Sequence, residues 1–123
     1  MSALDKEIRS QESLFLSRVP QSQALHERAS LTIPGGVPSS WASSRPVPVW
    51  VSHGEGAHVW DVDGNKYIDF HAGYGANIVG HANPAIVRAV QDRVTKGTHF
   101  AQPTPDSIVV AAELARRFGL PQW

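Results

Sequence analysis

Apolar residues recur at helical spacing in the first part of the chain, after Ser2, a residue type that often caps a helix. The apolar positions are Leu4, Ile8, Leu14 and Phe15. Pro20 interrupts the series, because the residue before a proline is disfavoured in a helix. The pattern predicts one amphipathic helix before Pro20 and a shorter one within residues 21–29. Residues 1–30 are therefore predicted to form an N-terminal helical segment.

Proline, glycine and serine dominate the next stretch, residues 31–48, with the sequence LTIPGGVPSSWASSRPVP. Its prolines, at 34, 38, 46 and 48, lack a backbone N–H. They therefore argue against a helix or a central strand in this stretch. The composition predicts a long ordered loop or a linker.

Three segments rich in β-branched and aromatic residues follow: 49–52, 57–62 and 65–70. A Gly-Glu-Gly turn at 54–56 separates the first two. The short turns between them predict a three-stranded antiparallel meander.

Asp63-Gly64 lies between the second and third segments and predicts a two-residue type I′ turn. In that register the opposing pairs would be Val62 with Asn65, Asp61 with Lys66, Trp60 with Tyr67, Val59 with Ile68, and His58 with Asp69. A calcium loop is the alternative interpretation. Placing Gly64 at its sixth position puts Val59 first and Phe70 twelfth, and neither side chain can bind a cation. The hairpin is the better prediction.

Two helices are predicted further along the chain, because each has a start signal and a stop signal in the sequence. Asn83 followed by proline begins the first and Gly97 ends it, whereas Thr104 followed by proline begins the second and Gly119 ends it. Their apolar stripes contain Ile86, Val87, Val90, Val94, Ile108, Ala111, Ala112, Ala115 and Phe118. Residues 49–123 thus combine a meander with two helices.

Composition narrows the possible functions. The chain has 123 residues, 41% of them hydrophobic, with 11 basic and 11 acidic residues and no cysteine. Balanced charge argues against nucleic-acid and anionic-membrane partners, and the lack of cysteine excludes thiol chemistry. No window approaches the roughly 20 apolar residues that a membrane-spanning helix needs. The start of the chain contains acidic residues and is not typical of a signal or transit peptide, so a cytoplasmic location is expected.

The residues alone predict no catalytic, cofactor-binding or metal-binding site. GYGANIVG, at 73–80, resembles a dinucleotide-binding loop, but its third glycine comes too late. The histidines lack the spacing of metal ligands on a helix or strand. Lys6, Lys66 and Lys96 occupy polar positions rather than the buried position that imine chemistry requires.

Four stretches together resemble the N-terminal part of class III pyridoxal-phosphate-dependent aminotransferases, and particularly the glutamate-1-semialdehyde aminomutase-like branch. They are IPGGV at 33–37, GEGAHVWDVDGNKYIDF at 54–70, GYGANIVGHANPAIVRAV at 73–90 and KGTHFAQPT at 96–104. The resemblance covers about residues 31–123. It implies a fold type I α/β architecture, in which residues 49–123 form part of the small domain and the start of the large domain.

The resemblance also implies a homodimer that uses pyridoxal 5'-phosphate to move amino groups between small-molecule donors and acceptors. In the family, the phosphate-binding stretch, the aspartate that pairs with the pyridine nitrogen and the imine lysine all lie beyond a position like Trp123. The isolated chain is therefore expected to be inactive, with no cofactor-binding residue of its own.

The resemblance assigns substrate binding to this part of the family. Ser39 matches the serine of the branch's G-G-V-x-S motif, and Tyr74 matches a tryptophan that lines the substrate pocket. Where the branch has an arginine that pairs with a substrate carboxylate, this chain has Ala42, and Arg45 is the nearby candidate replacement. Trp41, Ser40 and Gly73 are the expected neighbours.

Two hypotheses about function follow. In the first, the chain is the N-terminal portion of an aminotransferase or aminomutase. In the second, it is a non-catalytic interaction or dimerisation module that complements a separately encoded cofactor domain.

Overall fold

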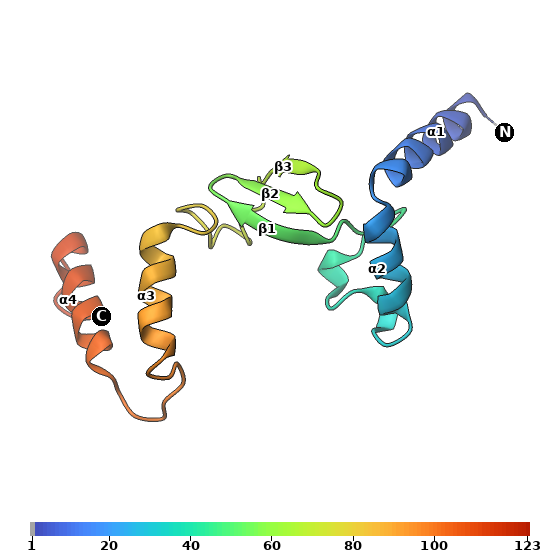
Figure 1. Cartoon of the computed structure of the whole chain (residues 1–123). Helices are drawn as coiled ribbons and strands as arrows, with labels where there is room; N and C mark the ends of the chain where they lie inside the picture. Colours follow the sequence, from blue (N-terminus) through green and yellow to red (C-terminus); the bar gives the residue numbers. More distant parts are fainter. Residues whose placement is uncertain (1) are drawn as a thin grey trace. The chain divides into compact units, whose positions relative to one another are not determined.

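The computed structural model describes residues 2–123 as two compact units, the first ending at Asn83 and the second spanning Pro84–Trp123 (Figure 1). The first unit contains helices α1 (Ala3–Arg18) and α2 (Pro20–Ser30), the 3₁₀ turns η1 (Pro34–Gly36) and η2 (Ser40–Ala42), and strands β1 (Val51–Glu55), β2 (His58–Asp61) and β3 (Lys66–Ile68). The second contains α3 (Pro84–Val94) and α4 (Pro105–Phe118). The predicted order of helices and strands is confirmed.

Helix α1 begins with a local capping box, whereas α2 has no cap of its own. Ser2 Oγ accepts a hydrogen bond from Asp5 N at 3.1 Å, and Asp5 Oδ2 accepts one from Ser2 N at 2.7 Å. Helix α2 starts at Pro20 after Val19, whose apolar side chain cannot cap and is fully buried. The first amides of α2 therefore need acceptors from elsewhere in the chain.

The three strands form one antiparallel sheet in the order β1-β2-β3. The predicted bounds of the first strand were wrong: Gly54 and Glu55 belong to β1, and the turn to β2 lies at Gly56 and Ala57. Gly56 has a φ of 55°, so the residue that allows this turn is the second glycine of Gly-Glu-Gly.

The predicted two-residue turn at Asp63-Gly64 was also wrong. The paired residues are His58 with Ile68, Val59 with Tyr67, and Trp60 with Lys66, which shifts the register by one position. Asp61 N donates to Asn65 O at 3.0 Å, and Gly64 N donates to Asp61 O at 3.2 Å. The loop therefore has three residues, 62–64, and its last residue, Gly64, is in the left-handed conformation with a φ of 87°.

The register shift has a physical cause in the Asp61 side chain, which is buried rather than paired with Lys66. Its Oδ1 accepts from Asp63 N at 3.0 Å and from Asn65 N at 2.7 Å. Its Oδ2 accepts from Asn65 Nδ2 and from the Tyr67 hydroxyl, both at 2.8 Å. These bonds require the carboxylate inside the loop, which the two-residue turn would not allow.

These contacts change the pKa of the Asp61 carboxyl and that of the Tyr67 hydroxyl. Burial acts to raise the pKa of the Asp61 carboxyl, but the four hydrogen bonds outweigh it and hold that pKa below its ordinary value. Burial, with the hydrogen bond to Asp61, raises the pKa of Tyr67 to about 12. The loop is therefore built around an ionised carboxylate.

Asp63 provides the missing cap of α2. Its Oδ1 accepts from Gln21 N at 2.6 Å, and its Oδ2 accepts from Ser22 N at 3.0 Å and Ser22 Oγ at 2.9 Å. The buried Ser22 hydroxyl in turn accepts from Trp50 N at 3.2 Å. A carboxylate at a helix N-terminus also interacts favourably with the helix dipole.

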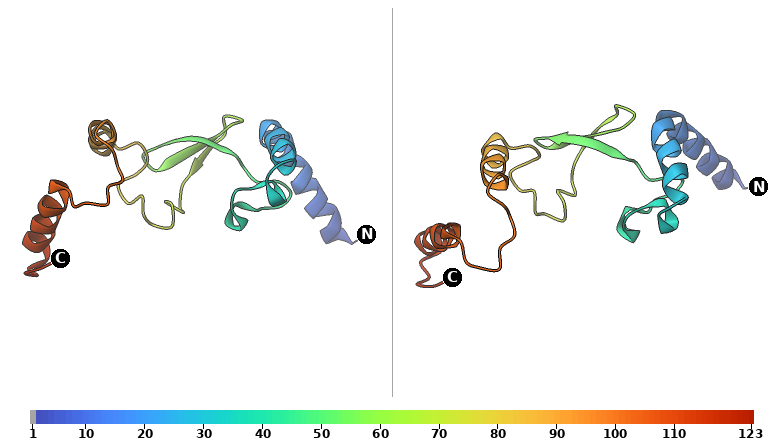
Figure 2. Two further views of the ribbon diagram at one scale, coloured as in Figure 1. Left: turned by 90° about the horizontal axis from the view of Figure 1, so that it is seen from below. Right: turned by 60° about the horizontal axis from the view of Figure 1, so that its bottom comes forward.

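Asn65 joins the same turn to the other helix, because its Nδ2 donates to Arg18 O at the end of α1 at 2.9 Å. Figure 2 shows the turn between β2 and β3 lying beside the junction of α1 and α2. The β2–β3 turn thus ties the sheet to both helices.

In the second unit, α4 ends at Gly119 in the left-handed conformation, as predicted. Thr104 stands at its N-cap position, but its side chain makes no cap hydrogen bond. Large apolar side chains remain exposed on both helices: Ile86, Val87, Val90, Val94, Ile108, Val109, Val110 and Phe118. Among residues 2–123, no helix has the length and apolar character needed to cross a bilayer.

The Asp61 carboxylate predicts a specific loss of stability in acid. The pKa of Asp61 in the folded chain lies below its ordinary value of 3.8, so its contribution to stability is complete well above that pH and is lost as the pH falls through the folded pKa. We expect the free energy of unfolding to fall more steeply below about pH 5 in the wild type than in Asp61→Asn, measured by urea denaturation with tryptophan fluorescence. Asp92→Asn, on the exposed surface of α3, is the control. Parallel pH curves for wild type and Asp61→Asn would contradict this role.

Candidate functional site

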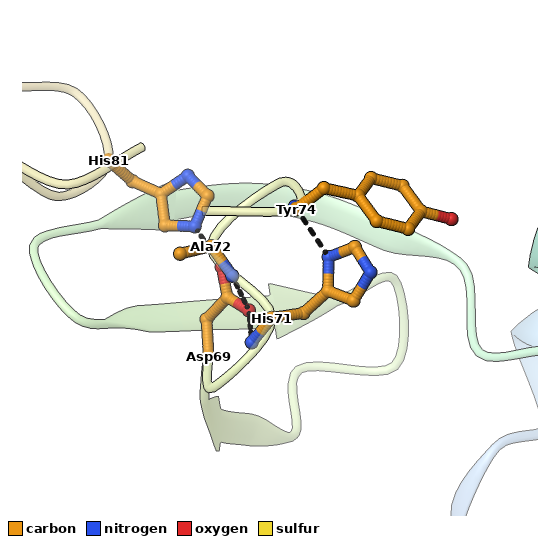
Figure 3. Close-up of polar contacts among 5 residues, drawn as sticks. All are labelled: Asp69, His71, Ala72, Tyr74 and His81. Carbon is orange, nitrogen blue, oxygen red and sulfur yellow. Dashed lines mark hydrogen bonds and ion pairs between the residues drawn. The ribbon is translucent and has the colours of Figure 1, made fainter. Parts of the chain in front are cut away.

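The candidate site is the glycine-rich loop that follows β3. Asp69, directly after the strand, accepts hydrogen bonds through Oδ1 from His71 N at 2.9 Å and Ala72 N at 3.0 Å. His71 Nδ1 then accepts a hydrogen bond from Tyr74 N at 3.2 Å (Figure 3). The His71 and Tyr74 rings pack edge to face, with their centroids 4.2 Å apart. The loop is held by a short series of polar contacts that leads from Asp69 to Tyr74.

Tyr74 has an unusual backbone conformation. Ala72, Gly73 and Tyr74 have φ values of 46°, 57° and 60°, so two non-glycine residues lie in the left-handed region. This conformation costs on the order of 1 kcal/mol or more for each residue with a Cβ, and such strain is concentrated at functional sites in proteins. The position of the Tyr74 ring is therefore imposed by its surroundings.

The Tyr74 ring contacts Trp41, from the Pro/Gly/Ser-rich segment. Their centroids are 5.9 Å apart at an interplanar angle of 85°, an edge-to-face arrangement. Tyr74 is 69% exposed and Trp41 82% exposed, so both rings present most of their surface outward. The structure thus brings together two segments that are separated by more than thirty residues along the chain.

Ser39 lies in the same neighbourhood, because its Oγ accepts from Trp41 N at 3.4 Å at the start of η2. Arg45 is exposed further along that segment. Within residues 2–123, the Arg45 side chain has no hydrogen bond or ion pair. The structure joins Trp41 to Tyr74 directly and Ser39 to them through Trp41, but Arg45 has no hydrogen bond to any of the three.

A second group of residues anchors the far end of the loop. His81 Nε2 lies 2.7 Å from Asp69 Oδ2, and the backbone of His81 pairs with that of Gly56 in both directions, at 3.0 and 2.8 Å. The hydrogen bond to His81, the largest cause, lowers the pKa of Asp69, and the amides of Ala72 and His71 add to it. A cavity of about 360 Å³ lies beside this pair, lined in part by Asn77 and Val79.

The sequence did not single out Asp69 and His81. A single aspartate and a single histidine twelve positions apart carry no recognisable spacing, and only the loop brings them into contact. The nearest signal in the sequence was the Gly-His pair before a predicted helix, which the family resemblance includes but to which it assigned no role.

The residues of this chain do not by themselves fit pyridoxal phosphate, the cofactor that the resemblance implies. An imine lysine must be shielded from water. The side chains of Lys6, Lys66 and Lys96 are all exposed, and the Lys66 ammonium lies over the Trp60 ring at 5.1 Å from its centroid. We therefore assign no catalytic step to these lysines. In the part of the chain that the structure describes, no cluster of three or more His, Asp or Glu residues could hold a metal ion.

Comparison with known proteins agrees with the resemblance. The family model for class-III aminotransferases matches residues 40–119. The chain is 39% identical over 110 residues to glutamate-1-semialdehyde 2,1-aminomutase of Methanothrix thermoacetophila, which covers 89% of this chain and 25% of the relative. The chain therefore spans about a quarter of the length of that curated relative.

Solved structures give the same result. A glutamate-1-semialdehyde-aminomutase from Pseudomonas aeruginosa PAO1 superimposes with a TM-score of 0.85 at 34% identity, covering 97% of this chain and 27% of that one. A transaminase with PLP bound superimposes with a TM-score of 0.74 at 41% identity, covering 80% of this chain and 23% of that one. The predicted fold class, the N-terminal part of a fold type I transferase, is confirmed.

The strain at Tyr74 can be measured with two substitutions at the same position. We expect Tyr74→Gly to be more stable than Tyr74→Ala by about 1 kcal/mol, because alanine keeps the Cβ that the left-handed conformation disfavours. The measurement is urea denaturation followed by circular dichroism. The same pair at Tyr67, in β3, is the control and should show the ordinary order, with alanine the more stable by about 0.5–1 kcal/mol. If the alanine variant is the more stable one at both positions, Tyr74 is not strained.

Proposed function

We propose that this chain, which belongs to the class-III aminotransferase family, forms the substrate side of the active site in a PLP-dependent aminotransferase or aminomutase. The observation that carries the proposal is the contact between Trp41 and Tyr74, which brings the Ser39 turn and the Gly-rich loop together. Because the chain spans about a quarter of its relative, the rest of the site would come from outside these residues.

Three side chains would bind substrate. The exposed face of the Tyr74 ring would pack against the carbon chain of the substrate, and the Ser39 hydroxyl would form a hydrogen bond to it. Arg45 would pair with a substrate carboxylate, since a guanidinium binds a carboxylate through two parallel hydrogen bonds. Its exposure and lack of a partner among the described residues support this role. The substrate class is a small amino acid or amino aldehyde.

The reaction would be the movement of an amino group, either between two molecules or within one. Both kinds of enzyme, an aminomutase and a transaminase, occur among the similar structures. In the complete enzyme, bound pyridoxal phosphate would supply the electron sink for this chemistry. The residues of this chain would bind and orient the substrate.

The apolar faces of α3 and α4 fit an origin in a larger, homodimeric enzyme. Each helix leaves valine and isoleucine side chains exposed, such as Val90 and Ile108, and contiguous apolar surface of this kind is typically covered by protein. The same faces are the observation that favours the second candidate, an interaction or dimerisation module that complements a separately encoded cofactor domain.

A hybrid enzyme tests the proposal. The chain would replace the matching N-terminal part of the Pseudomonas aeruginosa aminomutase, about a quarter of that protein, with the isolated chain measured in parallel. We expect the hybrid to bind PLP and convert the substrate of the parent enzyme. With PLP and borohydride, the isolated chain should show no specific reduction at any one lysine, because all three are exposed.

Two outcomes would contradict the proposal. The first is clean reduction at a single lysine of the isolated chain, which would place cofactor chemistry in these residues. The second is a hybrid that is folded and binds PLP but has no activity. A hybrid that folds without binding PLP, alongside an isolated chain that forms a discrete dimer, would favour the interaction module instead.

A further inference from the structure

Both oxygens of the Asp69 carboxylate are used, and they bind opposite ends of the same loop. Oδ1 accepts from the backbone amides of His71 and Ala72, at the start of the left-handed turn. Oδ2 lies 2.7 Å from His81 Nε2, at the end of the loop (Figure 3). A single side chain therefore closes residues 71–81 into one unit.

His81 gives this closure a fixed support. With the Asn77 amide oriented so that its nitrogen donates to Gly80 O at 2.8 Å, its oxygen accepts from His81 Nδ1 at 3.0 Å. The other ring nitrogen of His81, Nε2, lies 2.7 Å from Asp69 Oδ2, so each ring nitrogen has a polar neighbour. A Cβ on Gly54 would lie 2.6 Å from His81 Cγ, which shows how closely β1 approaches the ring. The imidazole is clamped between β1, Asn77 and Asp69.

The start of the loop has backbone hydrogen bonds, such as those from Gly75 N to His71 O at 3.2 Å and from Asn77 N to Ala72 O at 2.9 Å, and its side-chain support depends on Asp69. Tyr74 N donates to His71 Nδ1, and the amide of His71 itself is bound by Asp69. Left-handed residues that carry a Cβ persist only where the surrounding contacts impose them. In this loop, the side-chain hydrogen bonds to the left-handed turn come from Asp69 and from His71, whose own amide Asp69 binds.

We propose that Asp69, anchored by His81, is a positioning residue for substrate selection, because it holds the left-handed turn and thereby sets the place of the Tyr74 ring against Trp41. The proposal rests on the proposed function, in which Tyr74 contacts the substrate. Asp69 itself would not touch substrate, and its loss would change substrate affinity through Tyr74 alone.

The positioning step can be tested without cofactor, substrate or activity. The chain contains two tyrosines, Tyr67 and Tyr74, so fluorotyrosine labelling gives two ¹⁹F NMR signals, assigned with Tyr74→Phe. We expect Asp69→Ala to move the Tyr74 signal towards that of an unfolded peptide while the Tyr67 signal stays in place. Asp69→Asn keeps one acceptor oxygen and should move the Tyr74 signal in the same direction by less. Asp92→Ala, on α3, is the control and should move neither signal.

Each other NMR outcome contradicts the proposal. An unmoved Tyr74 signal in both Asp69 variants would show that the turn does not depend on the carboxylate. Loss of both signals in Asp69→Ala, with no change in Asp69→Asn, would show that Asp69 supports the sheet as a whole rather than the turn.

The link to substrate is tested in the hybrid enzyme with a double-mutant cycle. We expect Asp69→Ala to raise KM on the order of tenfold with little change in kcat, and to have no further effect on KM when Tyr74→Ala is present. If Tyr74→Ala leaves KM unchanged, the proposed role of Tyr74 fails. If Tyr74→Ala raises KM but Asp69→Ala does not, only the positioning role of Asp69 fails. Additive effects of the two substitutions would overturn the proposed route through Tyr74.

Discussion

The first unit depends on the docking of the β2–β3 turn against the junction of α1 and α2. Asp63 caps the first amides of α2, and Asn65 binds the last carbonyl of α1. Among the described residues, the only fully buried apolar side chain is Val19, which lies at this junction. With so little apolar burial, polar contacts must define how the helices meet the sheet. The ionised Asp61 carboxylate keeps the turn in the shape that presents Asp63 and Asn65.

The same sheet also positions the candidate site. The hydrogen bonds of β2 and β3 fix the start of the Gly-rich loop at Asp69, and the turn between β1 and β2 fixes its end at Gly56 and His81. The strained Tyr74 lies between these two anchors and meets Trp41 from the η2 segment. A rigid frame that imposes a costly backbone conformation on an exposed aromatic ring is consistent with a residue placed for binding rather than for stability.

The order of elements could be predicted from the sequence because its signals are local. Val19-Pro20, Gly97, Gly119 and the Asn-Pro and Thr-Pro pairs act on their own immediate backbone. The register of the hairpin could not be predicted in the same way. Asp63-Gly64 is a strong local signal for a type I′ turn, but Asp63 is held by Gln21 and Ser22, more than forty residues away. The buried Asp61 carboxylate, which binds the amides of Asp63 and Asn65, and this long-range contact together outweigh the local preference.

The candidate site was predictable only in part, for the same reason. The family resemblance pointed to Ser39 and Tyr74, and the structure brings their segments together through Trp41. No pattern in the sequence marks the contact of Asp69 with His81, or the left-handed backbone of a tyrosine. Both depend on the path of the loop.

Amide hydrogen exchange at Gln21 and Ser22 tests the central claim most directly. The first amides of a helix normally have no partner and exchange fast. If the β2–β3 turn docks on α2, both amides should be protected, compared with the equivalent Asp106 amide of α4, whose N-cap Thr104 makes no side-chain cap bond. Asp63→Ala should remove that protection. Fast exchange of Gln21 and Ser22 in the wild type, equal to that of Asp106, would contradict the account.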